Sequence, residues 1–177
     1  MQPITNEDLF AMVCGATQEV FATMLNLELQ VGNGYVDNAA AVSTNGIVSF
    51  VGLAGAWAGT GSISCSASFA CKISSQLMMS EYTAVDDDVL DALAEVTNMI
   101  IGNVKTALEE RVGPMGLSIP TVIYGRNFTS RTLGKQEWAI VPFRYGNEHM
   151  EIQVCLSPQK EGMRPRPAFA GESTLQI

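Results

Sequence analysis

Four residues in the middle of the chain have side chains and a spacing suited to chemistry or to partner binding. They are Asp91, Glu95, Asn98 and Gly102, in the segment DALAEVTNMIIGN. On an α-helix, at 100° per residue, they fall within about 60° of one another, on a single face. Glu95 and Asn98 are one turn apart, so both can enter one pocket of a partner. An amide both donates to and accepts from water, so Asn98 can orient a water molecule without titrating.

The same face also has an ordinary explanation. An exposed helix face is polar in most proteins, and Glu-x-x-Asn is a common tetrapeptide. Lys105 continues the line, about 40° from Asp91. Gly102 is harder to explain, because glycine costs a helix about 1 kcal/mol relative to alanine. Close approach of a partner's backbone would offset that cost, although relief of packing within the chain is the simpler alternative.

A long amphipathic helix is predicted to position these residues. It begins within the aspartates 86–88 and extends to about Arg111, before the helix-stopping pair Gly113-Pro114. Its apolar stripe lies on the other side and consists of Leu90, Leu93, Thr97, Ile100, Ile101, Val104 and Leu108. Three adjacent aspartates would also suit a metal site, but capping and the helix dipole explain them more simply.

A second helix is predicted at the N-terminus. It begins near Thr5 or Asn6, either of which can cap it, and extends to about Leu25 with apolar residues at helical spacing. Strands are predicted in most of the remaining chain. These elements predict an α+β, two-layer fold in which long helices pack on a largely antiparallel sheet.

The region between the two helices is rich in glycine and is predicted to be β throughout residues 32–80. The run from Ile63 to Cys71 alternates with a period of two, which indicates a strand with Cys65 and Cys71 on one face. The stretch GAWAGTGS resembles a phosphate-binding loop only superficially. It contains neither GxGxxG nor GxxxxGK[ST] and leads into a predicted strand, so hairpin turns are the better interpretation.

The C-terminal third is predicted to hold three further strands. Pro120 opens the first, and the runs 138–145 and 150–156 form an antiparallel hairpin. The proline-rich, charged segment that follows is predicted to be a flexible tail. We therefore expect one domain, residues 1–156, and a tail, residues 157–177.

Composition excludes several classes of function. The chain has 177 residues and a net charge of −8, without a basic cluster, so nucleic acid and anionic membranes are unsuitable partners. Its four cysteines form no CxxC pair and it has one histidine, which argues against a structural zinc site. The first residues do not have the pattern of a signal peptide, so we expect a cytoplasmic protein.

The spacing between this helix and the strand that follows it narrows the range of possible functions. Asp91, Glu95 and Asn98 are followed by Pro120, which opens a strand. This layout resembles the signature of the CheC/CheX/FliY family of chemotaxis phosphatases: an acidic or Ser position, then Glu, Asn and a distant Pro. The surrounding stretches IIGN, PTV and EVFATML resemble the family as well. CheC-type chains have two Glu-x-x-Asn helices, whereas the first helix here has Ala22 at the amide position, so the single site resembles CheX.

The resemblance implies hydrolysis of the aspartyl phosphate of a CheY-type response regulator in two-component signalling. Asn98 would orient the attacking water, and Glu95 would pair with the lysine of the regulator's phosphate site. From their place on the same face we also expect Asp91, Gly102 and Lys105 to contact the partner, with capping or bracing of the helix as the alternative role of Asp91. The protein would hold no cofactor or metal of its own, because the regulator supplies Mg²⁺, and it would form a homodimer through its sheets.

Two other functions remain compatible with the residues. The chain could be a non-catalytic module that binds a response regulator or a flagellar or chemoreceptor component. It could also be a structural dimer whose polar helix face has no partner.

Overall fold

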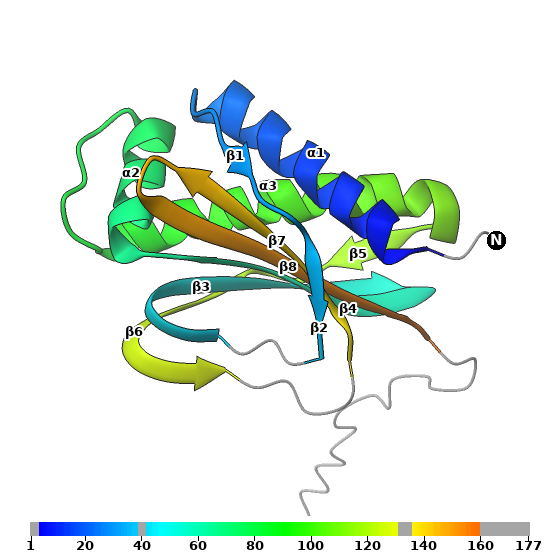
Figure 1. Ribbon diagram of the computed structural model, residues 1–177. Helices are drawn as coiled ribbons and strands as arrows, with labels where there is room; N and C mark the ends of the chain where they lie inside the picture. Colours follow the sequence, from blue (N-terminus) through cyan, green and yellow to red (C-terminus); the bar gives the residue numbers. More distant parts are fainter. Residues whose placement is uncertain (1–3, 39–41, 131–135, 160–177) are drawn as a thin grey trace, which may run out of the picture.

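The computed structural model describes residues 4–38, 42–130 and 136–159. Within them, helices α1 (Asn6–Met24), α2 (Ala67–Met78) and α3 (Asp87–Val112) lie on one face of a sheet (Figure 1). The strands are β1 (Gln30–Val31), β2 (Tyr35–Asp37), β3 (Val42–Gly55), β4 (Trp57–Cys65), β5 (Met115–Leu117), β6 (Thr121–Ser130), β7 (Trp138–Tyr145) and β8 (Glu148–Pro158). The molecule is thus a helix layer on a sheet layer, as the sequence predicts.

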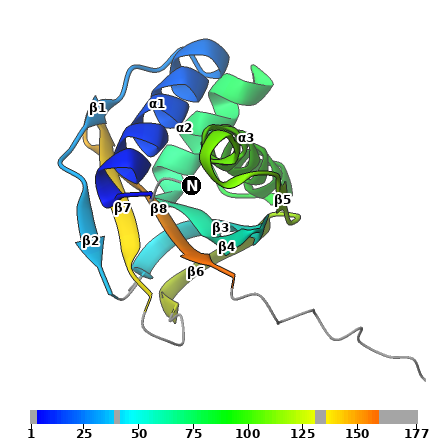
Figure 2. The same ribbon diagram turned by 90° about the vertical axis from the view of Figure 1, so that its right-hand side faces the viewer.

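All strand pairs in the described sheet are antiparallel, in the order β1-β7-β8-β4-β3-β5, with β2 also on β7 and β6 also on β3. One edge therefore carries β1 and β2, and the other carries β5 and β6. Figure 2 shows β2 and β5 on opposite sides of the molecule, with α3 on the β5 side. The predicted β7–β8 hairpin is present, with its turn at Gly146 and Asn147.

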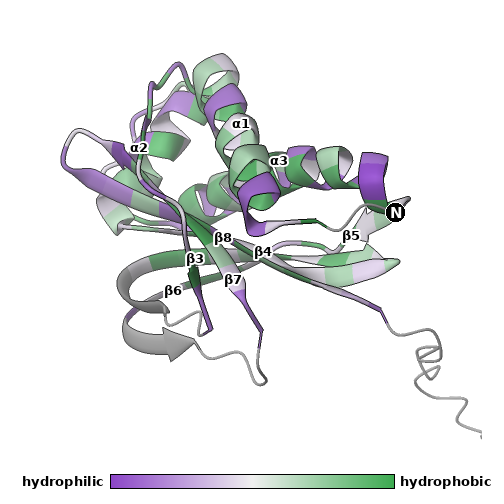
Figure 3. Ribbon diagram, turned by 45° about the vertical axis from the view of Figure 1, so that its right-hand side comes forward, coloured by the Kyte–Doolittle hydropathy of each residue, from purple (hydrophilic) through white to green (hydrophobic). Residues whose placement is uncertain are grey.

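The main core lies between the helices and the sheet, where Figure 3 shows hydrophobic central parts of the strands beneath the helices. The predicted stripe of α3 is buried except for Leu90, which is half-buried at its border. Trp138, Ile140 and Cys155 form a smaller buried cluster. On β7, Trp138 and Ile140 alternate with Ala139 and Val141 of the main core. On β8, Cys155 follows Val154 of the main core, so the small cluster lies on the opposite face of the sheet.

The helix ends follow from local hydrogen bonds. The Thr5 hydroxyl accepts from the backbone N–H of Asp8, whose carboxylate accepts from the Thr5 N–H, which is a capping box for α1. The Asp86 carboxylate accepts from the N–H of Val89 at 3.0 Å and caps α3. The aspartates 86–88 thus include a helix cap. Within the described residues, no group of three or more His, Cys, Asp or Glu side chains is placed to hold a metal ion.

The prediction that residues 32–80 are β throughout, with one strand over residues 63–71, is wrong. Strand β4 ends at Cys65, and α2 begins two residues later, so Cys65 and Cys71 belong to different elements. Ser66 caps α2 by accepting from the N–H of Phe69 at 3.1 Å. Its hydroxyl and that of Ser68 donate to the carboxylate of Glu148, at 2.6 and 2.8 Å. A partner distant in sequence therefore favours the helix over the strand here.

The stretch GAWAGTGS is a hairpin, as predicted, because β3 ends at Gly55 and β4 begins at Trp57. Two of its glycines are required by close packing. A Cβ at Gly59 would fall on the carbonyl oxygen of Cys155 in β8. A Cβ at Gly61 would lie 2.5 Å from the side chain of Ile101 in α3. These glycines allow the neighbouring strand and the helix to approach β4.

One boundary differs from the predicted domain limits. Strand β8 continues to Pro158, so the first two residues of the predicted tail belong to the sheet. The remainder of the predicted tail, residues 160–177, lies outside the described residues. No helix among the described residues is long and apolar enough to span a membrane.

Candidate functional site on helix α3

The structure places the predicted residues on α3, on the side away from the core. Asp91 and Glu95 are exposed, and Asn98 and Gly102 are half-buried. Their neighbours Val96, Thr97, Ile100 and Ile101 are fully buried, so packing against the sheet fixes the rotation of the helix about its axis. The predicted face is therefore present, and it is rigid because a 26-residue helix supports it.

The functional groups of Glu95 and Asn98 are available. Within the part of the chain that the structure describes, neither side chain takes part in a hydrogen bond or an ion pair. Both can therefore bond to a partner without breaking a contact of their own. Chemically, the face offers an acceptor carboxylate and, one turn later, an amide that both donates and accepts.

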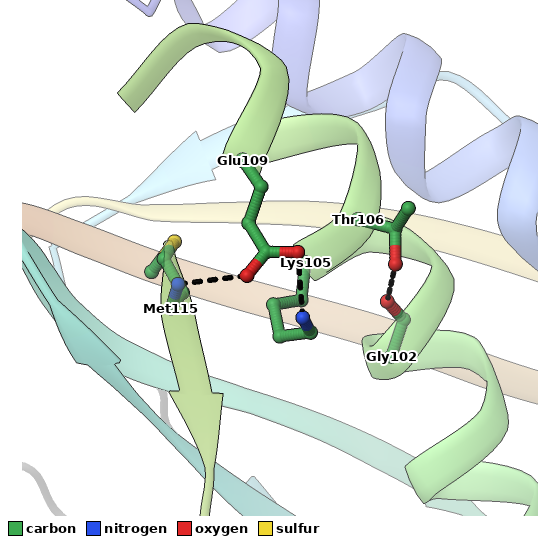
Figure 4. A network of polar contacts seen from close by, with 5 residues as sticks. All are labelled: Gly102, Lys105, Thr106, Glu109 and Met115. Atoms are coloured by element: carbon green, nitrogen blue, oxygen red, sulfur yellow. Dashed lines mark hydrogen bonds and ion pairs between the residues drawn. The ribbon is translucent and has the colours of Figure 1, made fainter. Parts of the chain in front are cut away.

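Lys105 lies on the same face but is engaged within the chain. Its ammonium group donates to the carboxylate of Glu109 at 2.7 Å, and the other carboxylate oxygen accepts from the backbone N–H of Met115 at 2.8 Å (Figure 4). The Lys105 ammonium, followed by the Met115 N–H, lowers the pKa of the Glu109 carboxyl below its usual value. A partner that contacts the Lys105 ammonium must therefore do so while that group is paired with Glu109.

Packing within the chain does not require a glycine at position 102. A Cβ there would meet only Leu117 Cδ1, at 3.7 Å, which is an ordinary van der Waals contact. The Gly102 carbonyl accepts from the Thr106 hydroxyl at 3.0 Å (Figure 4), a bond that alanine would also allow. The alternative explanation by packing relief is thus not supported, and the cost of the glycine to the helix is not offset by the described packing.

The segment that leads to Pro120 lies beside α3. After the helix ends, β5 runs back along it, so that Met115 is bonded to Glu109 and Leu117 lies next to Gly102. Pro120 is half-buried and directly precedes β6, which starts at Thr121. The distant proline of the motif thus belongs to a segment that returns toward the helix. The sequence spacing alone does not reveal this proximity.

A comparison with known protein families matches residues 47–144, more than half of the chain, to the chemotaxis phosphatase CheX. The chain belongs to the CheX family. The match includes α3, β5 and Pro120, so it covers the whole candidate site. A comparison with curated protein sequences gives no significant match.

Solved structures of CheX proteins share the fold. Chemotaxis protein CheX from Desulfovibrio desulfuricans is 26% identical, with a TM-score of 0.74, and the alignment covers 85% of this chain and 99% of that one. CheX from Vibrio vulnificus is 24% identical, with the same TM-score and coverage. A chain of the CheX–CheY–BeF3–Mg²⁺ complex from Borrelia burgdorferi is 29% identical, with a TM-score of 0.68 and coverage of 84% and 97%. The predicted family and fold class are confirmed.

Sequence reasoning did not find two features of the end of α3 and the segment that follows it. One is the bond from Met115 to Glu109, for which the i, i+4 spacing of Lys105 and Glu109 is a partial signal. The other is Ile119, whose side chain is 88% exposed directly before Pro120. An isoleucine between a serine and a proline gives no sequence signal of exposure, so only the structure reveals it.

Proposed function

We propose that this CheX-family chain hydrolyses the aspartyl phosphate of a CheY-type response regulator, with Glu95 and Asn98 inserted into the regulator's active site. The observation that carries the proposal is the pair itself: a carboxylate and an amide, one turn apart and without partners in the described chain, on the outer face of a rigid helix. The family assignment and the solved complex of a related CheX with CheY support it.

The residue types suit this reaction. An acyl phosphate is already activated, so a phosphatase need mainly place a water molecule in line with the phosphorus. The Asn98 amide accepts from that water through its oxygen or donates to it through its nitrogen, and holds it for attack. Positioning of this kind is commonly worth several kcal/mol, enough for a rate gain of about 10²–10³.

Glu95 has a binding role in this proposal. Its carboxylate pairs with a lysine at the regulator's phosphate site, and this charge-assisted bond sets the register of the two proteins. Mg²⁺ belongs to the regulator, and a solved CheX–CheY complex contains that ion together with BeF3. The chain described here contributes the amide that orients the water and the carboxylate that sets the register of the two proteins. We place the reaction in the cytoplasm, the compartment expected from the sequence.

We also propose a homodimer that forms through the sheets. Strand β6 is an edge strand that pairs only with β3 among the described strands. Ile123 and Tyr124 on this strand are 39% and 50% exposed. An edge with unpaired backbone groups and exposed apolar side chains is suited to pairing with a second chain. Sedimentation of the purified protein tests this, and a monomer at micromolar concentration contradicts it.

The activity is tested by following phosphate loss from a Mg²⁺-loaded, phosphorylated CheY-type regulator with the wild-type chain, Asn98→Ala and Asn103→Ala. Asn103 is a matched control because it is exposed on the same helix, about 140° from Asn98. We expect the wild type and Asn103→Ala to accelerate the loss and Asn98→Ala to lose about 10²-fold in rate. Equal rates for all three variants would contradict the assignment of Asn98.

The alternative is a non-catalytic module that binds the same regulator. It predicts that the wild type forms a complex with the regulator but leaves the rate of phosphate loss unchanged. Titration of a labelled regulator, run beside the rate assay, separates the two functions. A chain that neither binds nor accelerates contradicts both.

A further inference from the structure

We propose that Ile119 is an apolar anchor for the response regulator that receives Glu95 and Asn98. The inference rests on the proposed function and names a further residue of the same interface. Its basis is an isoleucine that is 88% exposed, in the hydrogen-bonded segment 118–120 that follows β5. It carries the highest exposure among the large hydrophobic side chains of the described residues apart from Met79.

The path of the chain brings Ile119 to that border. Met115 is bonded to Glu109 (Figure 4). Leu117 lies beside Gly102, so β5 proceeds along α3 toward the N-terminal half of the helix. Two further residues of extended chain span about 7 Å. Gly102 and Asn98 are four residues apart, or about 6 Å along the helix. A standard interface covers about 800 Å² on each partner, so a single partner can cover both Ile119 and Asn98.

A bulge in the sheet edge turns Ile119 outward. Strands β5 and β6 both pair with β3, at Leu53↔Leu117 and Phe50↔Thr121. Between these two pairs, β3 has two residues (51 and 52), whereas the opposite segment has three (118–120). The extra residue cannot continue the ladder, so the edge bends outward at this point. Bulges of this kind often re-aim a side chain beside a functional site.

Hydrogen bonds hold the bulge in one shape. The N–H of Ser118 donates to the carbonyl of Gly52 at 2.9 Å, and the N–H of Gly52 donates to the Ser118 hydroxyl at 2.8 Å. The same hydroxyl donates to the carbonyl of Ile119 at 3.0 Å. Pro120 restricts the backbone on the other side. A β-branched side chain on a fixed backbone loses little conformational entropy when a partner covers it, which favours binding.

The neighbouring groups indicate which partner covers Ile119. Glu95 and Asn98 offer only polar contacts, and protein interfaces generally combine such contacts with a desolvated apolar anchor. Gly102, on the same helix face, has no side chain that would keep a partner away from the helix. A regulator that contacts Glu95 and Asn98 can therefore cover Ile119 with an apolar part of its own surface. A second copy of this chain at Ile119 is the competing occupant.

The test compares Ile119→Ser with Ile119→Val and Val36→Ser. Val36 is the control because it is an exposed β-branched residue on β2, at the other edge of the sheet (Figure 2). The probes are CheY from Borrelia burgdorferi and the CheY-type regulators of the source organism, each loaded with Mg²⁺ and beryllofluoride. We expect Ile119→Ser to raise the Kd about tenfold, Ile119→Val to restore most of the affinity, and Val36→Ser to match wild type.

Kinetics and sedimentation complete the test. With phosphorylated regulator, Ile119→Ser should raise KM by a similar factor and keep most of kcat, because Asn98 is untouched. Wild-type Kd and KM for Ile119→Ser overturn the inference while the proposed function stands. Dissociation of a dimer by Ile119→Ser, with regulator affinity kept, overturns it in favour of the second copy. If the wild-type chain neither binds nor dephosphorylates any regulator, both the inference and the proposed function fail.

Discussion

The carboxylate of Glu109 accepts a 2.8 Å hydrogen bond from the backbone N–H of Met115 and so ties the last turn of α3 to the first residue of β5. Its other oxygen pairs with Lys105, one turn earlier on the same helix. This contact holds the start of β5 beside the helix, while pairing with β3 sets the register of the strand in the sheet. Leu117 then falls beside Gly102, and the loop that carries Ile119 and Pro120 follows.

We expect Glu109→Ala to lower stability and to loosen β5, because it leaves the N–H of the buried Met115 and the Lys105 ammonium without their partner. Glu109→Gln should fall between Ala and wild type, since its amide oxygen can still accept from Met115. Urea unfolding measures the loss of stability, and amide exchange at Met115 measures the loosening. Exposed Glu110 on the same turn provides the control Glu110→Ala. Wild-type exchange at Met115 in Glu109→Ala would show that the contact does not hold β5.

Gly102→Ala should stabilise the isolated chain by up to about 1 kcal/mol, because alanine favours the helix and its methyl group has room beside Leu117. The same change should weaken regulator binding if the partner approaches the helix backbone at this position. Thermal unfolding and a binding titration measure the two effects. Gly59→Ala is the contrasting control and should destabilise by about 1–3 kcal/mol, because its methyl group would strike the β8 backbone. A destabilised Gly102→Ala would refute the account of this glycine.

Glu95→Gln should weaken regulator binding by about tenfold or more, since a hydrogen bond between charged groups is worth about 1.5–3 kcal/mol. It should also reduce the dependence of affinity on salt, because an ion pair across the interface is lost. Titrations at two salt concentrations measure both effects. Glu7→Gln, an equal change of charge on α1, should alter neither. Unchanged affinity and salt dependence for Glu95→Gln would remove Glu95 from the interface.

Stability should fall in acid through Asp8. Hydrogen bonds from the backbone N–H and hydroxyl of Thr5, and then from Arg111, lower the pKa of its carboxyl from 3.8 to about 2. The folded state thus prefers the ionised form, so this contribution is complete above about pH 4 and is lost as the pH falls toward 2. Urea unfolding of wild type and Asp8→Asn at pH 7 and pH 3 measures it. The gap in stability between them should shrink at pH 3, and a constant gap would contradict the assignment.

The long helix and its functional face could be predicted from the sequence because both depend on local interactions. Asp86 caps the helix through its own side chain, and Gly113 followed by Pro114 ends it. The spacing of the apolar residues fixes which side is buried, and Glu95 and Asn98 then fall on the opposite side. A helical period sustained over 26 residues leaves few alternative secondary structures for this segment.

Tertiary structure decided the elements whose local signals were ambiguous. In α2, small serine, alanine and cysteine residues fit both a strand and a helix period. The helix is favoured by Glu148, which bonds to Ser66 and Ser68, and by the packing of Phe69 against Phe21 and Tyr145. All these partners are distant in sequence.

The surroundings of the site depend on the same kind of distant contact. The bulge at Ser118 is held by Gly52 from β3, and the start of β5 is held by Glu109 from α3. The exposure of Ile119 follows from both. Local propensities therefore determined which residues of α3 face outward. Pairing between distant segments decided which residues stand beside them, because a backbone group bonds to whatever the fold brings within reach, at any separation in sequence.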